Sequence, residues 1–320
     1  MHDTTQMRDA ADADTKRAWQ TRLTEIGDEL GYYEPVGADH AAFFVDEAPT
    51  LLVTFESGDA IRAATRGRMP LGYRVAQAHG WSHLCLIAEA DNWYRDRAVY
   101  GFFDRLLDDA FFEDFDRVVF YGAGMGGYGA AAFSVTAPGA QVLAIQPQAT
   151  LDPEVTEWDP RFAHKRRLNF TDRYGFAPDM TEGAGEVMVA YDPHRNLDAM
   201  HAALFTRPQT TKLRCRNLGP NIELELARMG ILEEMLTLAC QGRLDAAAFD
   251  RLYRARRGHQ PYLIRMLSRL DPSARPWLTA LWCRAALRRQ EHPRLRRTFE
   301  RAQAILDAQG ASLPEPAARS

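Results

Sequence analysis

The residues best able to organise chemistry form a glycine-rich turn between an apolar run and a run of small residues. Val118 to Tyr121 is typical of a buried strand, residues 122–127 (Gly-Ala-Gly-Met-Gly-Gly) form the turn, and Ala130 to Val135 indicates a helix. A strand, a sharp turn and a helix in this order can lift a nucleophile out of an α/β sheet. The nucleophile would stand third in the turn, where this chain has Gly124. A glycine there cannot form an acyl-enzyme intermediate.

The same turn also matches cofactor-binding patterns. Gly122, Gly124 and Gly127 satisfy G-x-G-x-x-G, which binds dinucleotides when an acidic residue follows the next strand. That strand ends in Gln146-Pro147-Gln148, without an acid. A methyl-donor site would need an acid just before the first glycine, where Tyr121 stands. A nucleotide- or S-adenosylmethionine-dependent enzyme therefore remains an alternative, and the main expectation is no cofactor.

The elements around the turn alternate between short apolar runs and helical stretches. The predicted strands are 50–56, 83–89, 117–121, 141–146, 186–191 and 212–216. The predicted helices before residue 219 are 15–31, 72–79, 96–112, 126–136 and 196–205. Short apolar strands separated by helices predict an α/β fold with a mostly parallel, doubly wound sheet covered on both faces.

Two segments interrupt this alternation. Residues 147–185 are too long for a plain connection and predict an insertion or lid. After Pro220 one helix is expected to run to about residue 236. Residues 241–310 indicate an all-helical, Arg-rich extension, for which a degenerate helical repeat is one interpretation. We therefore expect a disordered tail at 1–14, an α/β domain at 15–240, the extension at 241–310 and a second disordered tail at 311–320.

Charge is distributed unevenly along the chain. The net charge is −4, yet residues 241–320 contain 16 Arg, no Lys and 7 acidic residues, a local balance of +9 that leaves −13 for residues 1–240. Solvated helix faces explain such a bias, and docking of an acidic partner is the alternative. No nucleic-acid motif is present, so no nucleic acid is expected.

Several classes of protein are excluded by pattern. No apolar stretch approaches the length of a membrane span, and the first 16 residues lack a signal-peptide core. The four cysteines show no metal-ligand spacing, so no metal is expected. These features predict a soluble, cytoplasmic protein of undetermined oligomeric state.

The wider sequence resembles a bacterial branch of the α/β-hydrolase superfamily. In that branch the nucleophile elbow, which is the sharp turn between a strand and a helix that carries the catalytic Ser, reads Tyr-Gly-x-Ser-Met-Gly-Gly-Tyr-x-Ala. An apolar-Pro-Gln-x-x-x-Asp-Pro segment follows one strand later. This chain has the first pattern at Tyr121 to Ala130, with Gly124 in place of Ser, and the second around Pro147 to Pro153. Asn92-Trp93-Tyr94 also matches. The resemblance covers residues 40–235 and implies an α/β-hydrolase-like fold.

The resemblance implies a degenerate catalytic triad. Gly124 replaces the nucleophile, Asp192 stands at the place of the acid, and Pro220-Asn221 occupies the place of the base histidine. Neither residue can act as a general base near neutral pH. His194 and His201 are expected to lie on a surface helix, exposed to solvent. The residues expected to line a ligand site are Tyr121, Gly122, Gly124, Met125, Asn92, Trp93 and Gln148.

The functional expectation is a pseudoenzyme, a non-catalytic or catalytically degenerate α/β-hydrolase-like protein. It would bind a small polar or anionic ligand, a carbohydrate ligand or a protein partner, and the resemblance implies a loose link to surface-polysaccharide biology. A hydrolase that acts without a Ser nucleophile, using Asp192 or a lid residue to activate water, is the second alternative.

Overall fold

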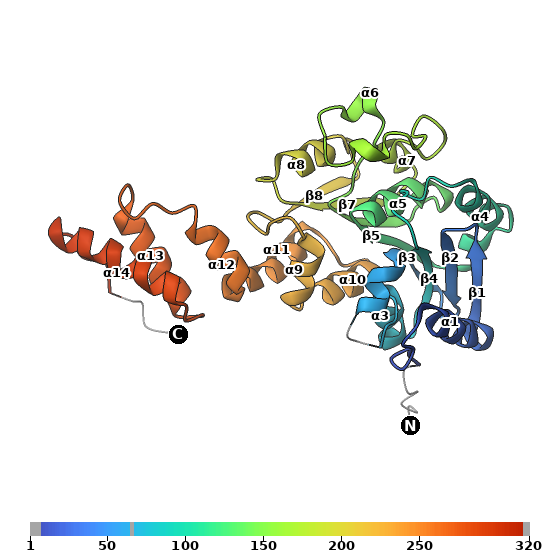
Figure 1. Cartoon of the computed structure of the whole chain (residues 1–320), viewed down its shortest axis with the longest axis horizontal. Helices are drawn as coiled ribbons and strands as arrows, with labels where there is room; N and C mark the ends of the chain where they lie inside the picture. Colours follow the sequence, from blue (N-terminus) through green and yellow to red (C-terminus); the bar gives the residue numbers. More distant parts are fainter. Residues whose placement is uncertain (1–7, 65–66, 316–320) are drawn as a thin grey trace.

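The computed structural model describes residues 8–64 and 67–315, and a single eight-stranded sheet forms its centre (Figure 1). The strand order is β1-β2-β4-β3-β5-β6-β7-β8. Antiparallel pairing joins β2 to β1 and to β4, and every other neighbouring pair is parallel. The strands are β1 (Gly31–Val36), β2 (His40–Val45), β3 (Thr50–Ser57), β4 (Ser82–Ala88), β5 (Arg117–Ala123), β6 (Gln141–Ile145), β7 (Glu186–Tyr191) and β8 (Thr210–Arg214).

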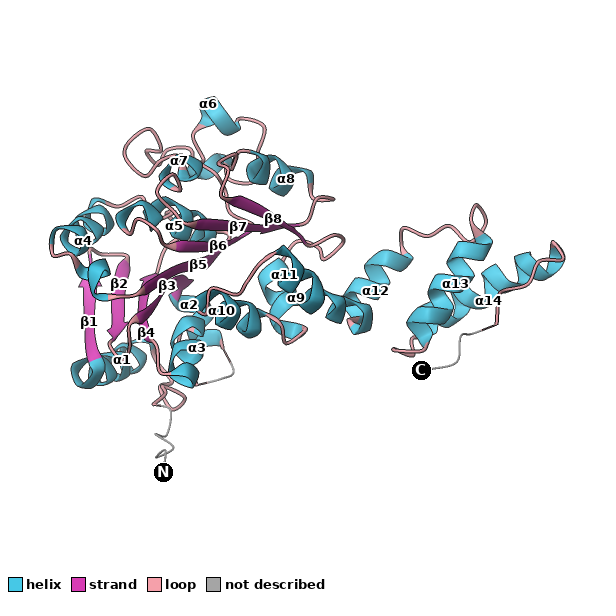
Figure 2. Cartoon of the chain, turned by 180° about the vertical axis from the view of Figure 1, so that it is seen from behind, coloured by secondary structure: helices cyan, strands magenta, loops and turns pink. Residues whose placement is uncertain are grey.

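Helices cover both faces of this sheet, as the alternation of elements predicts (Figure 2). One face packs against α4 (Arg97–Asp108), α5 (Met125–Phe133), α7 (Ala177–Met180) and α8 (Asn196–Ala203). The other face packs against α1 (Lys16–Leu30), α2 (Gly58–Ala63), α3 (Leu71–His79), α9 (Ile222–Arg228), α10 (Leu232–Cys240) and α11 (Ala246–Leu252). Because both faces are buried, the central strands are continuous apolar runs.

The first two strands lie outside the sequence prediction. β1 contains Pro35 and pairs only with β2, so it is an edge strand where a missing N–H is tolerated. β2 is buried along its whole length, and its short run gives no alternating pattern. The predicted helix from 219 to 236 is also wrong, because Gly230 adopts a φ of +71° and separates α9 from α10.

The insertion between β6 and β7 contains only short helical turns. These are α6 (Pro153–Thr156), a 3₁₀ turn at Ala163–Lys165 and α7. Arg95, after β4, donates hydrogen bonds to the carbonyl oxygens of Asn169 and Arg173, which ties the insertion to the sheet.

The C-terminal helices α12 (Gln260–Leu267), α13 (Pro276–Leu287) and α14 (Pro293–Ala308) extend away from the sheet. Of the two predicted disordered tails, 1–14 and 311–320, the structure describes residues 8–14 and 311–315, whereas 1–7 and 316–320 lie outside the described residues. Ala10 is buried and its N–H donates to the oxygen of Gly67, and Leu313 packs beside α14. Among the described residues, no helix is both long enough and apolar enough to cross a membrane.

Candidate active-site crevice

The turn after β5 has the backbone of a nucleophile elbow, with Gly124 at its third position. Gly124 precedes α5 with φ +56° and ψ −119°, a backbone conformation that residues with a side chain rarely adopt. Its N–H donates to the oxygen of Ile145 on the adjacent strand at 2.8 Å. A Cβ built on Gly124 would meet no heavy atom within 4 Å. The position therefore opens into free space, as a reactive side chain there would require.

The flanking glycines are fixed by close packing inside the protein. A Cβ on Gly122 would overlap the backbone oxygen of Gly126, and a Cβ on Gly126 would overlap the backbone oxygen of Phe55 on β3. These contacts let β5 turn sharply into α5. They account for the glycines at 122 and 126 without a bound nucleotide.

A crevice of about 390 Å³ lies beside Gly124. Loops that follow β5, β6 and β8 line it, together with the insertion and α8, and ligands of open α/β sheets bind at this carboxyl edge. The lining residues are Ala123, Gly124, Gln146, Gln148, Arg161, Phe162, Asp198, Pro220, Asn221, Glu223 and Leu224.

A charged network forms one wall of the crevice. The Arg161 guanidinium donates to Asp159 at 2.7 Å and to Asp198 at 2.5 Å. Gln146 donates to Asp198 at 2.9 Å and accepts the N–H of Ile222 at 2.7 Å, which joins the wall to the start of α9. Burial opposes ionisation of Asp159, but hydrogen bonds from Arg161 and His201 outweigh it and lower the pKa of this carboxyl. Arg161 and Asp198 are site residues that the sequence prediction missed.

His201 belongs to the same network and is buried, so the expectation of a solvent-exposed histidine is wrong. Its Nδ1 accepts the N–H of Ala149 at 3.2 Å, and its Nε2 donates to Asp159 at 3.0 Å. Burial lowers the pKa of the imidazole, which favours the neutral form. Because both ring nitrogens have partners, His201 has no free nitrogen to accept a proton from the crevice.

Glu223, on the first turn of α9, places a carboxyl group in the opposite wall. It accepts the phenol hydrogen of Tyr121 at 2.5 Å. Burial raises the pKa of Glu223, and the nearby Glu56 carboxylate raises it further. Burial also raises the pKa of Tyr121 well above its ordinary value. Tyr121 is fully buried, so it contacts the crevice only through Glu223.

Asp192, at the place of a triad acid, supports the backbone instead of lining the crevice. It is buried and accepts the N–H groups of His194 at 3.0 Å, Asn217 at 3.0 Å and Gly219 at 3.1 Å. Its carboxylate thus holds the loop after β8. Asn221, near the place of the base, does line the crevice and precedes α9.

Of the seven residues predicted to bind a ligand, Gly124 and Gln148 line the crevice, and the other five are not among its lining residues. Trp93 is buried and donates from its indole to Gln148 at 3.1 Å, while its backbone N–H donates to the sulfur of Met125 at 3.2 Å. Asn92 accepts from His40 at 3.0 Å. These side chains position Gln148 and the elbow. Tyr121 and Gly122 belong to the buried end of β5.

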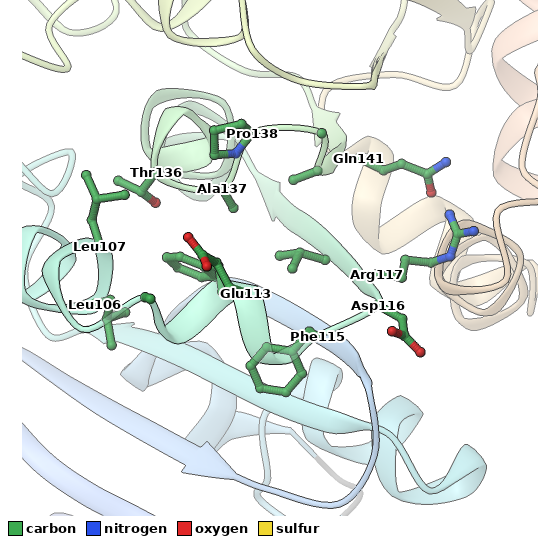
Figure 3. A pocket seen from close by; sticks show the side chains of 15 residues that line it. Leu106, Leu107, Glu113, Phe115, Asp116, Arg117, Thr136, Ala137, Pro138 and Gln141 are labelled. Atoms are coloured by element: carbon green, nitrogen blue, oxygen red, sulfur yellow. The ribbon is translucent and has the colours of Figure 1, made fainter.

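Two other features of the described chain compete with the crevice as sites. Ligand atoms of Glu56, His83 and Cys85 lie within 4.8 Å of one another. The Thr54 hydroxyl bonds Glu56 at 2.9 Å and His83 at 3.0 Å, and Glu56 also accepts the N–H groups of Leu71 and Gly72. Among the described residues, Nδ1 of His83 has no hydrogen-bond partner. A cavity of about 620 Å³ lies at the other end of β5 and β6, with Phe115, Leu106 and Pro138 around it (Figure 3). Its lining residues, all of them in the described part of the chain, include no His or Cys side chain.

Comparison with known proteins returns structures but no sequence relatives. No family model matches the chain, and no curated protein matches it. The thermophilic carboxylesterase EstE1 from a metagenomic library is 12% identical, with a TM-score of 0.43 over 73% of this chain and 99% of that one. An esterase from the archaeon Pyrobaculum calidifontis is 17% identical, with a TM-score of 0.42 over 73% and 90%. An S-formylglutathione hydrolase from Agrobacterium tumefaciens is 12% identical, with a TM-score of 0.42 over 66% and 92%.

The architecture itself identifies the fold. The sheet has eight strands in the order 1-2-4-3-5-6-7-8, with β2 antiparallel to its neighbours, and the glycine elbow follows β5 at the carboxyl edge. This chain has the fold of the α/β-hydrolase superfamily.

Proposed function

We propose that the crevice binds a neutral, hydroxyl-bearing ligand, of which a saccharide is the typical case, and that the chain forms no acyl-enzyme. One observation carries the proposal. The elbow backbone is retained at Gly124, yet the lining of the crevice includes no Ser, Thr, Cys or His side chain. Amide, carboxyl and guanidinium groups surround the position instead. Such groups recognise hydroxyls by hydrogen bonding and supply no nucleophile for acyl transfer.

The charge balance of the lining favours a neutral ligand over an anion. Arg161 is the cationic residue of the lining, and both Asp159 and Asp198 bond its guanidinium. Glu223 adds a further acidic group on the other wall. An anion entering the crevice would meet no unpaired positive side chain there, and desolvating it would be unfavourable.

The polar groups are held in fixed positions, which suits a ligand with several hydroxyls. Gln146 is held by Asp198 and Ile222, and Gln148 is held by Trp93. Phe162 provides an apolar ring surface beside them. Preorganised donors and acceptors with one apolar surface are typical of small-ligand sites.

Saturation-transfer NMR with a panel of neutral mono- and disaccharides tests this proposal, with glucuronate as the charged comparison. Neutral sugars are expected to give transfer and glucuronate none. Asn221→Ala removes an exposed crevice side chain and is expected to weaken binding by about tenfold. Asn196→Ala, an exposed residue outside the crevice, is the matched control and is expected to leave binding unchanged. Preference for glucuronate, or equal effects of both variants, would contradict the proposal.

Hydrolysis without a nucleophilic side chain is a second candidate function. The observation that favours it is the Glu223 carboxyl, which lines the crevice and whose pKa burial raises, so that it keeps its proton to a higher pH than an exposed glutamate does. A screen of aryl esters and aryl glycosides, with Glu223→Gln as the comparison, decides the question. Turnover that Glu223→Gln abolishes would support hydrolysis, and absence of turnover in the wild type would remove this candidate.

A further inference from the structure

We propose that the C-terminal arm, defined as α12, α13 and α14, is a docking surface for an acidic segment of a partner protein that also presents apolar side chains. The segment would lie along the outward face of α13. This proposal is independent of what the crevice binds.

The arm leaves one face of α13 without a partner. Both views show α13 and α14 beyond the body of the protein, and α13 packs mainly against α14. The inward face of α13 is buried through Thr279, Ala280, Cys283 and Ala286. Residues spaced three and four apart on the opposite side form the outward stripe, which consists of Trp277, Leu278, Leu281 and Ala285.

The outward stripe is more apolar than a solvated helix face. Trp277 is 43% exposed and Leu278 is 51% exposed. Leu281 is half-buried and Ala285 is exposed, and neither belongs to the two small clusters that hold the arm together. A helix that buries residues on one face and keeps apolar residues on the other is typical of a surface that packs against a second element.

Arginines stand at both ends of the outward stripe. Arg288 and Arg289 follow it at the end of α13, and Arg275 precedes it. Arg301 of α14 donates from its guanidinium to the hydroxyl of Ser273, in the turn before α13, at 3.3 Å. Within the described part of the arm, these four arginines make no ion pair. Guanidinium groups bind carboxylates through two hydrogen bonds, so the charge complement of this surface is acidic.

The combination of charge and apolar surface selects a protein segment. An amphipathic acidic helix would bury leucine-like side chains on Trp277 and Leu278 and place carboxylates on the arginines. Nucleic acid would use the arginines but would gain little from the leucines. A second copy of this chain is the other acidic candidate, because residues 1–240 carry a balance of −13.

The first helix of the arm, α12, is anchored to α9 and to the loop after β8, and Leu263 of α12 packs in one cluster with Ala286 of α13 and Leu295 of α14. Arg265 of α12 pairs with Glu225 of α9 and donates to the oxygen of Asn217 at 3.1 Å. Arg269 donates to the Asn217 side chain at 2.6 Å, and His259 lies 2.9 Å from Glu225. A preorganised surface loses less entropy on binding than a mobile one.

Fluorescence anisotropy with the full chain tests the proposal. The probe is a labelled synthetic helix of Glu and Leu with leucines on one face, and the comparison probes replace Glu by Gln or Leu by Ala. The Glu/Leu helix is expected to bind at least about tenfold more tightly than either comparison probe. The Trp277→Ala/Leu278→Ser variant should lose about tenfold in affinity, and Arg288→Ala/Arg289→Ala should lose about threefold, an effect that added salt diminishes.

Matched variants distinguish binding at the outward stripe from nonspecific electrostatic and hydrophobic binding elsewhere on the chain. Leu107→Ala removes an equally exposed leucine from α4, and Arg254→Ala/Arg257→Ala removes two exposed arginines outside the outward stripe. Both are expected to bind the Glu/Leu helix as the wild type does. Equal losses in these controls would overturn the proposal. So would tighter binding of a DNA duplex, or self-association in light scattering that Trp277→Ala/Leu278→Ser abolishes.

Discussion

The turn after β5 and the turn after β8 differ in how closely the surrounding residues hold them. At the first turn the backbone has the geometry of a nucleophile elbow, and a side chain at Gly124 would meet open space. At the second turn, Asp192 binds the backbone of residues 217–219 from one side, while Arg265 and Arg269 bind Asn217 from the other. A single substitution could place a hydroxyl at the first turn, whereas hydrogen bonds on Asp192 and on Asn217 hold the second turn in place.

This difference supports the proposal that the crevice holds a ligand and forms no covalent intermediate. A nucleophile needs a base within hydrogen-bond reach. The acid and the histidine nearest to this role already make hydrogen bonds within the protein. The carboxylate of Asp192 accepts three backbone N–H groups, and both nitrogens of His201 have partners. The strongest tests therefore perturb each turn separately.

The largest effect is expected at the elbow backbone, from Gly122→Ala. The added methyl would overlap the oxygen of Gly126, so β5 or α5 must shift, at a cost of about 4 kcal/mol of unfolding free energy. Gly101→Ala in α4 meets no atom within 4 Å and should instead stabilise the chain by about 0.5–1 kcal/mol. Urea unfolding monitored by circular dichroism measures both. Equal stability of the two variants would show that the elbow is not closely packed.

The next effect is expected at the turn after β8, from Asp192→Ala. Three backbone N–H groups lose their acceptor, two of them in this turn, and we expect a loss of about 3 kcal/mol. Asp152→Ala removes the side chain that caps α6, which accepts one hydrogen bond, from the N–H of Glu154. This variant should lose about 1 kcal/mol of unfolding free energy. Thermal and urea unfolding compare the two. If Asp192→Ala unfolds no more easily than Asp152→Ala, the carboxylate is not the support of this turn.

A smaller effect is expected from Gly124→Ser, which refills the first turn alone. The Cβ has space, so the cost is backbone strain of about 1–2 kcal/mol. The variant should stay folded, and it should not hydrolyse p-nitrophenyl acetate because no base faces the new hydroxyl. Stopped-flow absorbance tests for a burst. Turnover above the wild type would show that a base is available and would remove the contrast between the two turns.

The smallest effect is a pH dependence at Glu223, on the element that follows the second turn. Burial raises its folded pKa, so the folded chain binds more protons than the unfolded chain, and stability falls as pH rises from the unfolded pKa through the folded one. Glu223→Gln cannot ionise and should not show this loss. Above the folded pKa, its free energy of unfolding should therefore gain on that of the wild type by about 1.4 kcal/mol for each unit by which the pKa is raised. The exposed Glu234→Gln is the control for urea titrations from pH 4 to pH 8. A gap between Glu223→Gln and the wild type that does not widen with pH would contradict the assignment.

Sequence reasoning predicted the fold well where local pattern decides it. The strands β3 to β8 are apolar runs between helices, and the elbow follows from the glycines at 122, 124 and 126. The sequence did not predict the elements whose secondary structure or ends depend on tertiary contacts or on a single backbone turn. β2 is a strand because β1 and β4 pair with it on both sides, and α9 ends because Gly230 turns left-handed.

The candidate site was less predictable, because its contacts join residues far apart in the chain. Arg161 bonds Asp198 across 37 residues, and Tyr121 bonds Glu223 across 102 residues. A glutamate on the first turn of a helix has the pattern of a solvated residue. The sequence analysis did not single out Arg161 or Phe162, and the signal that the sequence does contain is the position of their Asp-Pro-Arg-Phe run, 159–162, within the long insertion.

Mass spectrometry of the wild-type chain, with a neutral disaccharide and p-nitrophenyl acetate both present, tests most directly whether the crevice holds a ligand without covalent chemistry. Under native conditions we expect a complex with the disaccharide, and after denaturation we expect the unmodified mass of the chain. An acetyl adduct that survives denaturation and is lost in Asn221→Ala but kept in Asn196→Ala would contradict the account. Failure to retain any neutral sugar from the panel would contradict it as well.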